Sequence, residues 1–318
     1  MKTVILDGYT INPGDLSWDG LAETGKYKVY DRTAPKDVIK RASGADAVLT
    51  SKVLMTADVI AALPELKYIG VLATGYNNVD LDYAGSRGIT VTNIPAYSTE
   101  SVAQLVFAMI LAFTNRVEHH SDLVLRGKWA KARDFAFRAS PLIELAGKTV
   151  GIVGMGNIGN RVADIAGSFG MRVLGNSRTK TDQSHRPYFQ WADFNELLRL
   201  SDFVSLNCPL TGDNVGFINY NSVSLMKKTA FLINAARGGL VDEAGLARAL
   251  NEGVIAGAAL DVLPQEPPQK DNVLYRAKNV LITPHIGWAT YEARARLVDI
   301  AVGNVKAFAQ GAPVNTVV

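Results

Sequence analysis

Short apolar runs alternate with helical patterns along the first hundred residues. We expect strands at residues 3–6, 47–49, 68–72 and 89–91. Helical periodicity lies between them, at residues 35–43, 56–63 and 80–87, and Gly44 and Gly88 are placed to end the first and the third helix. Strands that alternate with helices predict parallel βαβ units, so this part of the chain is expected to form one α/β domain.

A second alternating series follows residue 148. Its expected strands are almost continuous apolar runs, at residues 149–153, 172–174, 203–206, 230–233, 257–260 and 280–282. Runs of this kind are typical of a parallel sheet that is buried on both faces. An apolar helix is expected before the series, at residues 100–114, and an amphipathic helix closes the chain at residues 290–308. The predicted fold class is therefore α/β, with two parallel sheets.

Composition narrows the class of protein. The chain has 318 residues, 48% of them hydrophobic and 20% charged, which suits about two globular domains and excludes a disordered chain. Cys208 is its only cysteine, so neither an intrachain disulfide nor a cysteine-based metal cluster can form, and no metal site is expected. The net charge of +3 is too small to indicate nucleic-acid binding.

No segment has the pattern of a signal peptide or of a membrane span. Asp7 interrupts the N-terminal apolar run, and the most apolar stretch, residues 102–113, is shorter than the roughly 20 residues that cross a bilayer. We therefore expect a cytoplasmic protein that binds neither membranes nor nucleic acid.

A glycine-rich turn is the first candidate for chemistry. Gly154-Met155-Gly156-Asn157-Ile158-Gly159 follows the expected strand 149–153 and opens a helical pattern at residues 160–169. In this context the first glycine permits a tight turn, the second lets the backbone approach a pyrophosphate, and the third lets the helix pack close to the strand. The helix N-terminus offers free N–H groups to the anion. The turn therefore predicts a dinucleotide site; a βα turn without a ligand is the alternative.

The next expected strand ends without the acidic residue that usually binds the 2′-hydroxyl group of NAD. Ser177 lies 18 residues after Gly159, and Arg178 and Thr179 follow it. A neutral serine beside a guanidinium suits a 2′-phosphate, because like-charge repulsion is absent and a cation is available. We therefore expect NADP(H) to be favoured, with NAD(H) possible. The alternative is that Arg178 is a solvated loop residue.

Three ionisable side chains follow three other strands of the second series. Arg237 comes after residues 230–233, Glu266 after 257–260 and His285 after 280–282. Ligands of such sheets bind beyond the carboxyl ends of the strands, so we expect these side chains at the same edge as the glycine turn. An arginine can bind a substrate carboxylate, a histidine can deliver a proton, and a glutamate can orient the imidazole and favour its protonated form. The set suits reduction of a 2-oxo acid, although each residue alone has a structural alternative, as a surface ion pair, a loop carboxylate or a strand-end histidine.

Four segments together resemble the D-isomer-specific 2-hydroxyacid dehydrogenase family. They are residues 154–159, Asn234-Ala235-Ala236-Arg237-Gly238-Gly239, residues 261–267, and Pro284-His285-Ile286-Gly287. The resemblance covers essentially the whole chain. It implies two Rossmann-like domains, with a cofactor domain (residues 100–287) inserted into a smaller flavodoxin-like substrate domain (residues 1–99 plus 288–318), and a small 2-oxo or 2-hydroxy acid bound in the cleft.

The resemblance also implies roles for single residues. Arg237, Glu266 and His285 would be catalytic, and Arg237 would also bind the substrate. Besides the glycine turn and the contacts already expected from Ser177, Arg178 and Thr179, cofactor contacts would come from Cys208, Pro209, Ala235, Asp261 and Gly287. Backbone N–H groups of the turn Ala73-Thr74-Gly75 would bind the substrate carboxylate. Residues 100–138 would form a helix and a dimerisation arm, which predicts a homodimer.

Within the family the chain most resembles the glycerate dehydrogenases, also called hydroxypyruvate reductases. The likeness lies in residues 6–10, 73–80 and 93–99, and in Lys128-Trp129 followed by Asp134-Phe135-Ala136-Phe137. Arg138 departs from it, since an aromatic residue often stands there. The expected reaction is reduction of hydroxypyruvate or glyoxylate to the D-2-hydroxy acid. The alternatives are another D-2-hydroxyacid dehydrogenase, of the D-lactate or phosphoglycerate type, a dinucleotide-sensing corepressor of the same fold, and a catalytically weak NAD(P)-binding scaffold.

Overall fold

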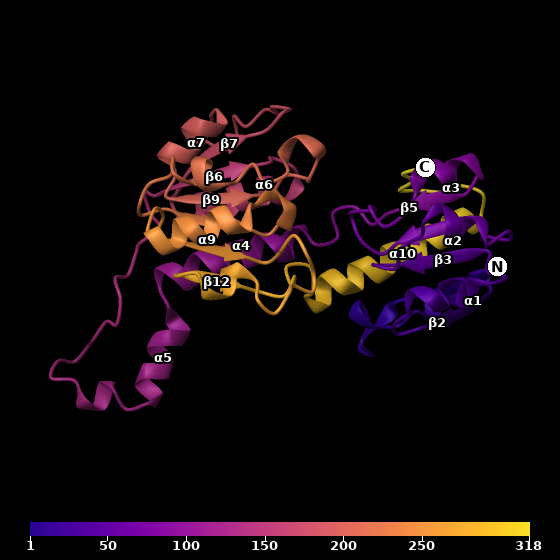
Figure 1. The fold of residues 1–318 in the computed structure, drawn as a ribbon, viewed down its shortest axis with the longest axis horizontal. Helices are drawn as coiled ribbons and strands as arrows, with labels where there is room; N and C mark the ends of the chain where they lie inside the picture. The colour runs from indigo at the N-terminus through magenta and orange to yellow at the C-terminus, as the bar shows by residue number, and fades with distance from the viewer. The chain divides into compact units, whose positions relative to one another are not determined.

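The chain forms two compact units in a computed structural model that describes residues 1–318 (Figure 1). The first unit consists of residues 1–98 and 289–318, and the second of residues 99–288. The second unit is therefore inserted into the sequence of the first. These bounds differ by one residue from the expected ones, 1–99 with 288–318 and 100–287.

The first unit is built on a five-stranded parallel sheet in the order β2-β1-β3-β4-β5. This is the flavodoxin-like strand order. Its strands are β1 (Lys2–Ile5), β2 (Lys26–Val29), β3 (Ala47–Thr50), β4 (Tyr68–Val71) and β5 (Thr90–Thr92). The apolar pattern misses β2, because this edge strand alternates exposed lysines with half-buried residues and contains no apolar run.

Four helices belong to the first unit: α1 (Val38–Ala42), α2 (Ala57–Ala61), α3 (Leu81–Ser86) and α10 (Tyr291–Ala309). Side chains of Thr56 and Asp80 cap α2 and α3 by accepting backbone N–H groups. The last helix, α10, packs on the sheet, where the rings of Phe308 and Tyr68 lie 4.8 Å apart. The C-terminal segment thus completes the core of the unit that the N-terminal segment begins.

The second unit is built on a seven-stranded parallel sheet in the order β12-β11-β10-β9-β6-β7-β8. Its strands are β6 (Thr149–Val153), β7 (Arg172–Asn176), β8 (Phe189–Trp191), β9 (Phe203–Leu206), β10 (Phe231–Asn234), β11 (Gly257–Leu260) and β12 (Val280–Ile282). Counted from β6, this is the Rossmann order with a seventh strand added. The chain adds β7 and β8 on one side of β6 and then crosses to add β9 on the other side, so the strand order reverses between β6 and β9. The fold-class prediction is confirmed, although β8, a short edge strand, is missing from the predicted elements.

Successive strand residues of the second unit face two separate cores. Ile152 and Ile233 belong to the core beneath α4 (Thr99–Thr114) and α6 (Asn157–Ser168). Val153 and Leu232 face the opposite core, which α7 (Phe194–Leu200), α8 (Tyr220–Val223) and α9 (Glu243–Glu252) cover. Both faces of this sheet are therefore buried, as its apolar runs predict. No helix in either unit is long and apolar enough to cross a membrane.

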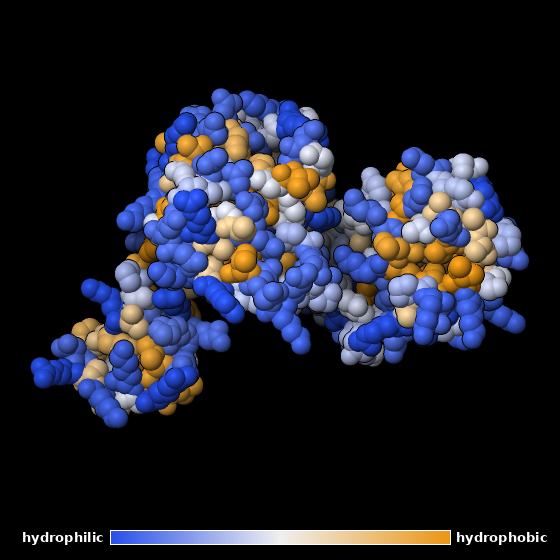
Figure 2. All heavy atoms as spheres, viewed as in Figure 1, coloured by the Kyte–Doolittle hydropathy of each residue, from blue (hydrophilic) through white to orange (hydrophobic).

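A segment rich in exposed apolar side chains lies between α4 and β6. It contains α5 (Val117–Leu125) and the 3₁₀ turn Trp129–Lys131, and no residue of α5 is buried. Leu125 is 84% exposed and Phe135 is 93% exposed. Figure 2 shows apolar atoms among charged ones on the surface of this segment. We call residues 115–138 the arm.

Candidate active site

The glycine turn has the geometry that a dinucleotide requires. Gly154 has φ +98°, and a Cβ there would lie 2.6 Å from backbone atoms of Asn207 and Cys208. A Cβ on Gly159 would lie 2.0 Å from the carbonyl oxygen of Gly154, so the helix and the turn need both glycines. Over Gly156 nothing lies within 4 Å of the Cβ position. The turn is thus closely packed at Gly154 and Gly159 and open at Gly156, where a pyrophosphate would lie.

The surroundings of the turn also fit a dinucleotide. Gly156 is the N-cap of α6, and no side chain caps this helix, so its first N–H groups are available to an anion. The turn follows β6, and Cys208 and Pro209 follow β9, so both lie at the point where the strand order reverses. Asn207 Oδ1 is buried there without a hydrogen-bond partner, as a site completed by ligand donors would leave it.

The loop that follows β7 carries Ser177, Arg178 and Thr179, which we call the ribose loop. Ser177 is half-buried, and the other two residues are exposed. Burial raises the pKa of the Cys208 thiol, and the positive charge of Arg178 partly offsets this rise. Because β6 and β7 are parallel neighbours, the loop that follows β7 lies at the same sheet edge as the glycine turn that follows β6.

The turn after β10 presents Arg237 to solvent. Asn234, fully buried at the end of the strand, donates through Nδ2 to the carbonyl oxygen of Arg237 at 2.9 Å and accepts the N–H of Ala236 at 3.0 Å. Arg237 Nη1 donates only to the neighbouring carbonyl of Ala236, at 2.8 Å. A Cβ on Gly238 would lie 1.9 Å from the carbonyl carbon of Leu263, so this turn packs directly against the segment that leads to Glu266.

His285 and Glu266 are in direct contact. Nδ1 of His285 lies 2.6 Å from Oε2 of Glu266, and Oε1 of Glu266 accepts the N–H of Leu263 at 3.0 Å. Both side chains are about one-third exposed, at 31% and 33%. With the carboxylate charged, Nδ1 carries the proton that Glu266 accepts, so Nε2 is the nitrogen that can exchange a proton with a substrate.

Asp261 orders the turn that holds His285. Its buried carboxylate accepts hydrogen bonds from Thr283 Oγ1 at 2.6 Å and from the N–H groups of Ile286 and Gly287, both at 2.8 Å. His285 itself has φ +55°, a left-handed conformation that a non-glycine residue adopts only when its surroundings enforce it. Its backbone N–H donates to the carbonyl oxygen of Asp261 at 2.8 Å. Asp261 therefore acts on the histidine through the backbone.

The expected carboxylate turn, Ala73-Thr74-Gly75, lies in the first unit and follows β4. Thr74 Oγ1 donates to the carbonyl oxygen of Ile94 at 2.8 Å, and Asn93 Nδ2 donates to the carbonyl oxygen of Thr74 at 2.8 Å. These bonds hold the turn without using the N–H groups of Thr74 and Gly75. The two N–H groups thus remain available to an anion.

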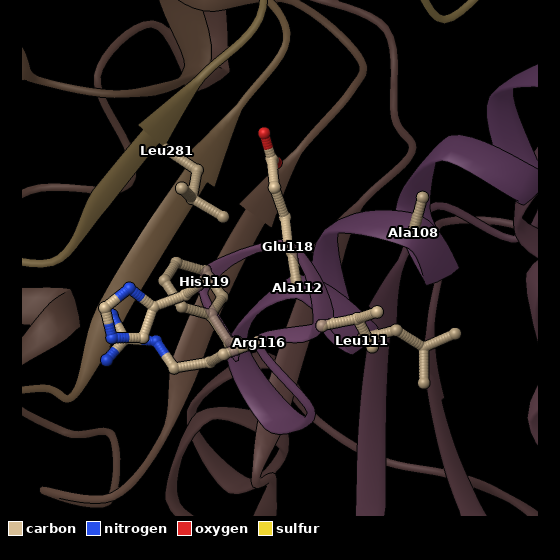
Figure 3. Close-up of a pocket in the computed structure, with 9 residues that line it drawn as sticks. Ala108, Leu111, Ala112, Arg116, Glu118, His119 and Leu281 are labelled. Carbon is tan, nitrogen blue, oxygen red and sulfur yellow. The ribbon is translucent and has the colours of Figure 1, made fainter. Parts of the chain in front are cut away.

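A cavity of about 410 Å³ lies in another part of the second unit (Figure 3). It is lined by the end of α4, the start of α5 and Leu281 of β12, and by none of the expected catalytic or cofactor residues. Glu118 and His119 from α5 line it together with the apolar Leu111, Ala112 and Leu281. The cavity lies where the arm joins α4 and β12, and not at the catalytic edge of the sheet.

The residues that position these groups were not predicted from the sequence. The glycine turn and the turns that carry Arg237 and His285 are held by Asn160, Asn234 and Thr283, and Asn160 is itself held by Gln183 and Arg186. The first three stand next to a motif residue, which is their only signal in the sequence. Gln183 and Arg186 have no such signal, because their partner Asn160 comes from another segment of the chain.

Comparisons with known proteins agree with this geometry. Residues 107–287 match the model of the NAD-binding domain of the D-isomer specific 2-hydroxyacid dehydrogenases. A hydroxypyruvate reductase from Blautia hydrogenotrophica is 45% identical over 320 residues, covering 100% of this chain and 99% of that protein. A glycerate dehydrogenase from Methylorubrum extorquens is 40% identical and covers 92% of each chain. An acyclic imino acid reductase, solved in complex with NADPH and D-Arg, superposes with a TM-score of 0.87 at 31% identity over 100% of both chains.

Proposed function

Because the chain belongs to the D-isomer specific 2-hydroxyacid dehydrogenase family, we propose that it reduces hydroxypyruvate and glyoxylate to the D-2-hydroxy acids, with His285 as proton donor. The chain is an oxidoreductase that acts on CH–OH groups and uses a nicotinamide dinucleotide. The observation that carries the proposal is the 2.6 Å contact between His285 and Glu266, at the sheet edge that also bears Arg237 and the glycine turn.

Each residue has a distinct task in this reaction. When bound, the reduced nicotinamide supplies the hydride that adds to the carbonyl carbon of the substrate. Arg237 pairs with the substrate carboxylate and polarises the carbonyl group. Nε2–H of His285 gives its proton to the carbonyl oxygen as negative charge develops there. Glu266 stabilises the imidazolium before this step and keeps Nδ1 protonated after it.

Two observations support the proposed substrates: the names of two similar proteins, and a turn that can bind a carboxylate. Two similar proteins are named hydroxypyruvate reductase and glycerate dehydrogenase. The turn Ala73-Thr74-Gly75 offers two backbone N–H groups, which suit a carboxylate of a small acid. We propose NADP(H) as the favoured cofactor, because the ribose loop holds Arg178 and no acidic residue. A reducing compartment, the cytoplasm, suits a chain with a single free cysteine.

A substrate panel tests the proposed function. The purified protein is assayed with hydroxypyruvate, glyoxylate, pyruvate and larger branched or aromatic 2-oxo acids, each with NADPH and with NADH. We expect the highest kcat/KM with hydroxypyruvate or glyoxylate. A clearly higher kcat/KM with a branched or aromatic acid would refute the glycerate assignment and leave the dehydrogenase class intact. Absence of turnover with every acid would refute the catalytic proposal itself.

Replacing Glu266 with glutamine is expected to lower kcat for hydroxypyruvate reduction. The carboxylate accepts from Nδ1 of His285 at 2.6 Å, which orients the ring and balances its positive charge. A neutral amide supplies no charge and can turn either its oxygen or its nitrogen toward Nδ1, so the ring is held less well. The measurement is kcat at saturating substrate and cofactor for the parent and for Glu266→Gln. An unchanged kcat would show that Glu266 does not act through His285.

We also propose that the protein is a homodimer formed through residues 100–138. The support is the exposure of Leu125, Trp129 and Phe135 on the arm, and the largely apolar cavity at its base (Figure 3). Exposed apolar surface of this kind marks an interface in a protein that stays in solution. We infer that Arg138, three residues after Phe135, belongs to the same interface.

Replacing Phe135 with aspartate is expected to produce monomers. A charge buried at a subunit interface without a partner costs enough to dissociate a dimer of moderate affinity. Light scattering at micromolar concentration compares the mass of the parent, of Phe135→Asp, and of the control Val215→Asp, which places the same charge on a 66% exposed residue outside the arm. A parent protein that is already monomeric would refute the dimer proposal.

A further inference from the structure

A buried arginine outside the catalytic set lies beside the cofactor edge of the second unit. Arg186, in the loop between β7 and β8, is only 7% exposed. Its Nε donates to Asp164 Oδ1 at 2.8 Å, and its Nη1 donates to Asn160 Oδ1 at 2.9 Å and to Gln183 Oε1. Burying a guanidinium is costly unless its donors are satisfied, and here carboxylate and amide oxygens satisfy them.

Asn160 connects this arginine to the glycine turn. The same amide that accepts from Arg186 donates through Nδ2 to the carbonyl oxygens of Met155 at 2.9 Å and Gly156 at 3.0 Å. These two carbonyl groups belong to the turn that is open for a pyrophosphate. Arg186 therefore fixes the orientation of the Asn160 amide, and Asn160 in turn braces the phosphate-binding backbone.

Gln183 connects the same arginine to the loop after β7. Gln183 is buried, and its Nε2 donates to Thr181 Oγ1 at 2.8 Å and to Asn160 Oδ1 at 3.3 Å. Thr181 lies two residues after the last residue of the ribose loop. The chain before the ribose loop is therefore held by β7, and the chain after it is held at Thr181 by Gln183, which in turn accepts from Arg186. Arg178 and Thr179 are themselves exposed.

We propose that Arg186, Gln183 and Asn160 form a clamp that sets the distance between the ribose loop and the glycine turn. This distance must match the one between the pyrophosphate and the 2′ position of the cofactor. Arg186 is thus a positioning residue for cofactor choice and touches neither the substrate nor the reacting atoms. The inference rests on the proposed dinucleotide roles of the two segments that the clamp joins.

The test is a double-mutant cycle on cofactor binding. Dissociation constants for NADPH and NADH are measured by fluorescence titration, without substrate, for the parent, Arg186→Met, Arg178→Ala and the double variant. We expect Arg178→Ala to weaken NADPH binding about tenfold in the parent and less than about twofold in the Arg186→Met background, since the loop is then displaced. Arg186→Met alone is expected to weaken NADPH binding several-fold more than NADH binding.

Two further variants separate positioning from folding. Gln183→Met removes the link to the loop but keeps Arg186 bonded to Asp164 and Asn160, and it should show the same pattern with a smaller amplitude. Arg199→Met, which replaces an exposed arginine of α7, should leave both dissociation constants unchanged. Thermal unfolding identifies any variant that fails to fold, and in that case the Gln183→Met cycle decides the matter.

The outcomes distinguish this inference from the proposed cofactor choice. If Arg178→Ala weakens NADPH binding equally in both backgrounds, the cofactor proposal stands and the clamp is overturned. If Arg178→Ala weakens NADPH and NADH binding alike, and does so only with Arg186 present, placement of the ribose loop by the clamp is supported, and Arg178 is refuted as the residue that distinguishes the 2′-phosphate. If Arg178→Ala changes neither dissociation constant, both proposals are overturned.

Discussion

Replacing His285 with alanine is expected to lower kcat for hydroxypyruvate reduction by about 10²–10⁴-fold, while the dissociation constant of the cofactor stays nearly unchanged. The imidazole acts in the transition state, when the carbonyl oxygen receives its proton. Cofactor phosphates are expected at residues 154–159, whose geometry depends on the packing of Gly154 and Gly159 and not on His285. Steady-state kinetics measures kcat, and a fluorescence titration measures cofactor binding separately.

A second histidine provides a control, which shows whether a loss of turnover is specific to His285. His185 is exposed and lies outside the ribose loop and the catalytic turns, so His185→Ala should keep the parental kcat. Near-parental turnover by His285→Ala would remove His285 from the mechanism. A parallel loss of turnover and of cofactor binding would show that the substitution disturbs the turn that Asp261 organises, and not the proton transfer alone.

The central strands could be predicted because each carries an apolar run that both cores require. Residues 149–153 illustrate this: the observed β6 has the same bounds, and all five of its residues are buried. β2 and β8 escaped prediction for the opposite reason. Polar residues interrupt the apolar ones in both strands: Lys26 and Lys28 in β2, and Gln190 in β8. The edge strand β12 has the same half-buried exposure as β8 but was predicted, because its sequence, Val280-Leu281-Ile282, is wholly apolar.

The candidate site also has a part that could be predicted from the sequence and a part that could not. Arg237, Glu266 and His285 could be proposed together because each follows a parallel strand, and parallel strands end at one edge of a sheet. The hydrogen bond between His285 and Glu266 is visible only in the folded chain, since it depends on the paths of the loops that follow β11 and β12. The clamp around Arg186 is a similar case: its partners, Asn160 and Asp164, come from α6, and nothing in the sequence links that helix to residue 186.

The second large effect is expected from the ribose loop, where replacing Ser177 with aspartate and Arg178 with alanine together should invert the cofactor preference. Ser177 can donate a hydrogen bond to a 2′-phosphate, and Arg178 can pair with its charge. A charge-assisted hydrogen bond contributes about 1.5–3 kcal/mol, so losing one weakens NADPH binding by roughly 10–150-fold. The new carboxylate adds repulsion toward the phosphate and accepts hydrogen bonds from the 2′-hydroxyl group of NADH.

The comparison of kcat/KM for NADPH and NADH, before and after the double substitution, decides the matter. Arg172→Ala is the matched control, because it removes an exposed arginine from the opposite end of the same strand, β7, and should leave the ratio unchanged. A clear preference of the parent for NADH would mean that Arg178 does not bind a 2′-phosphate. Equal losses with both cofactors on Arg178→Ala would instead place its guanidinium against a part that the two share, such as the adenine ring, where stacking supports both alike.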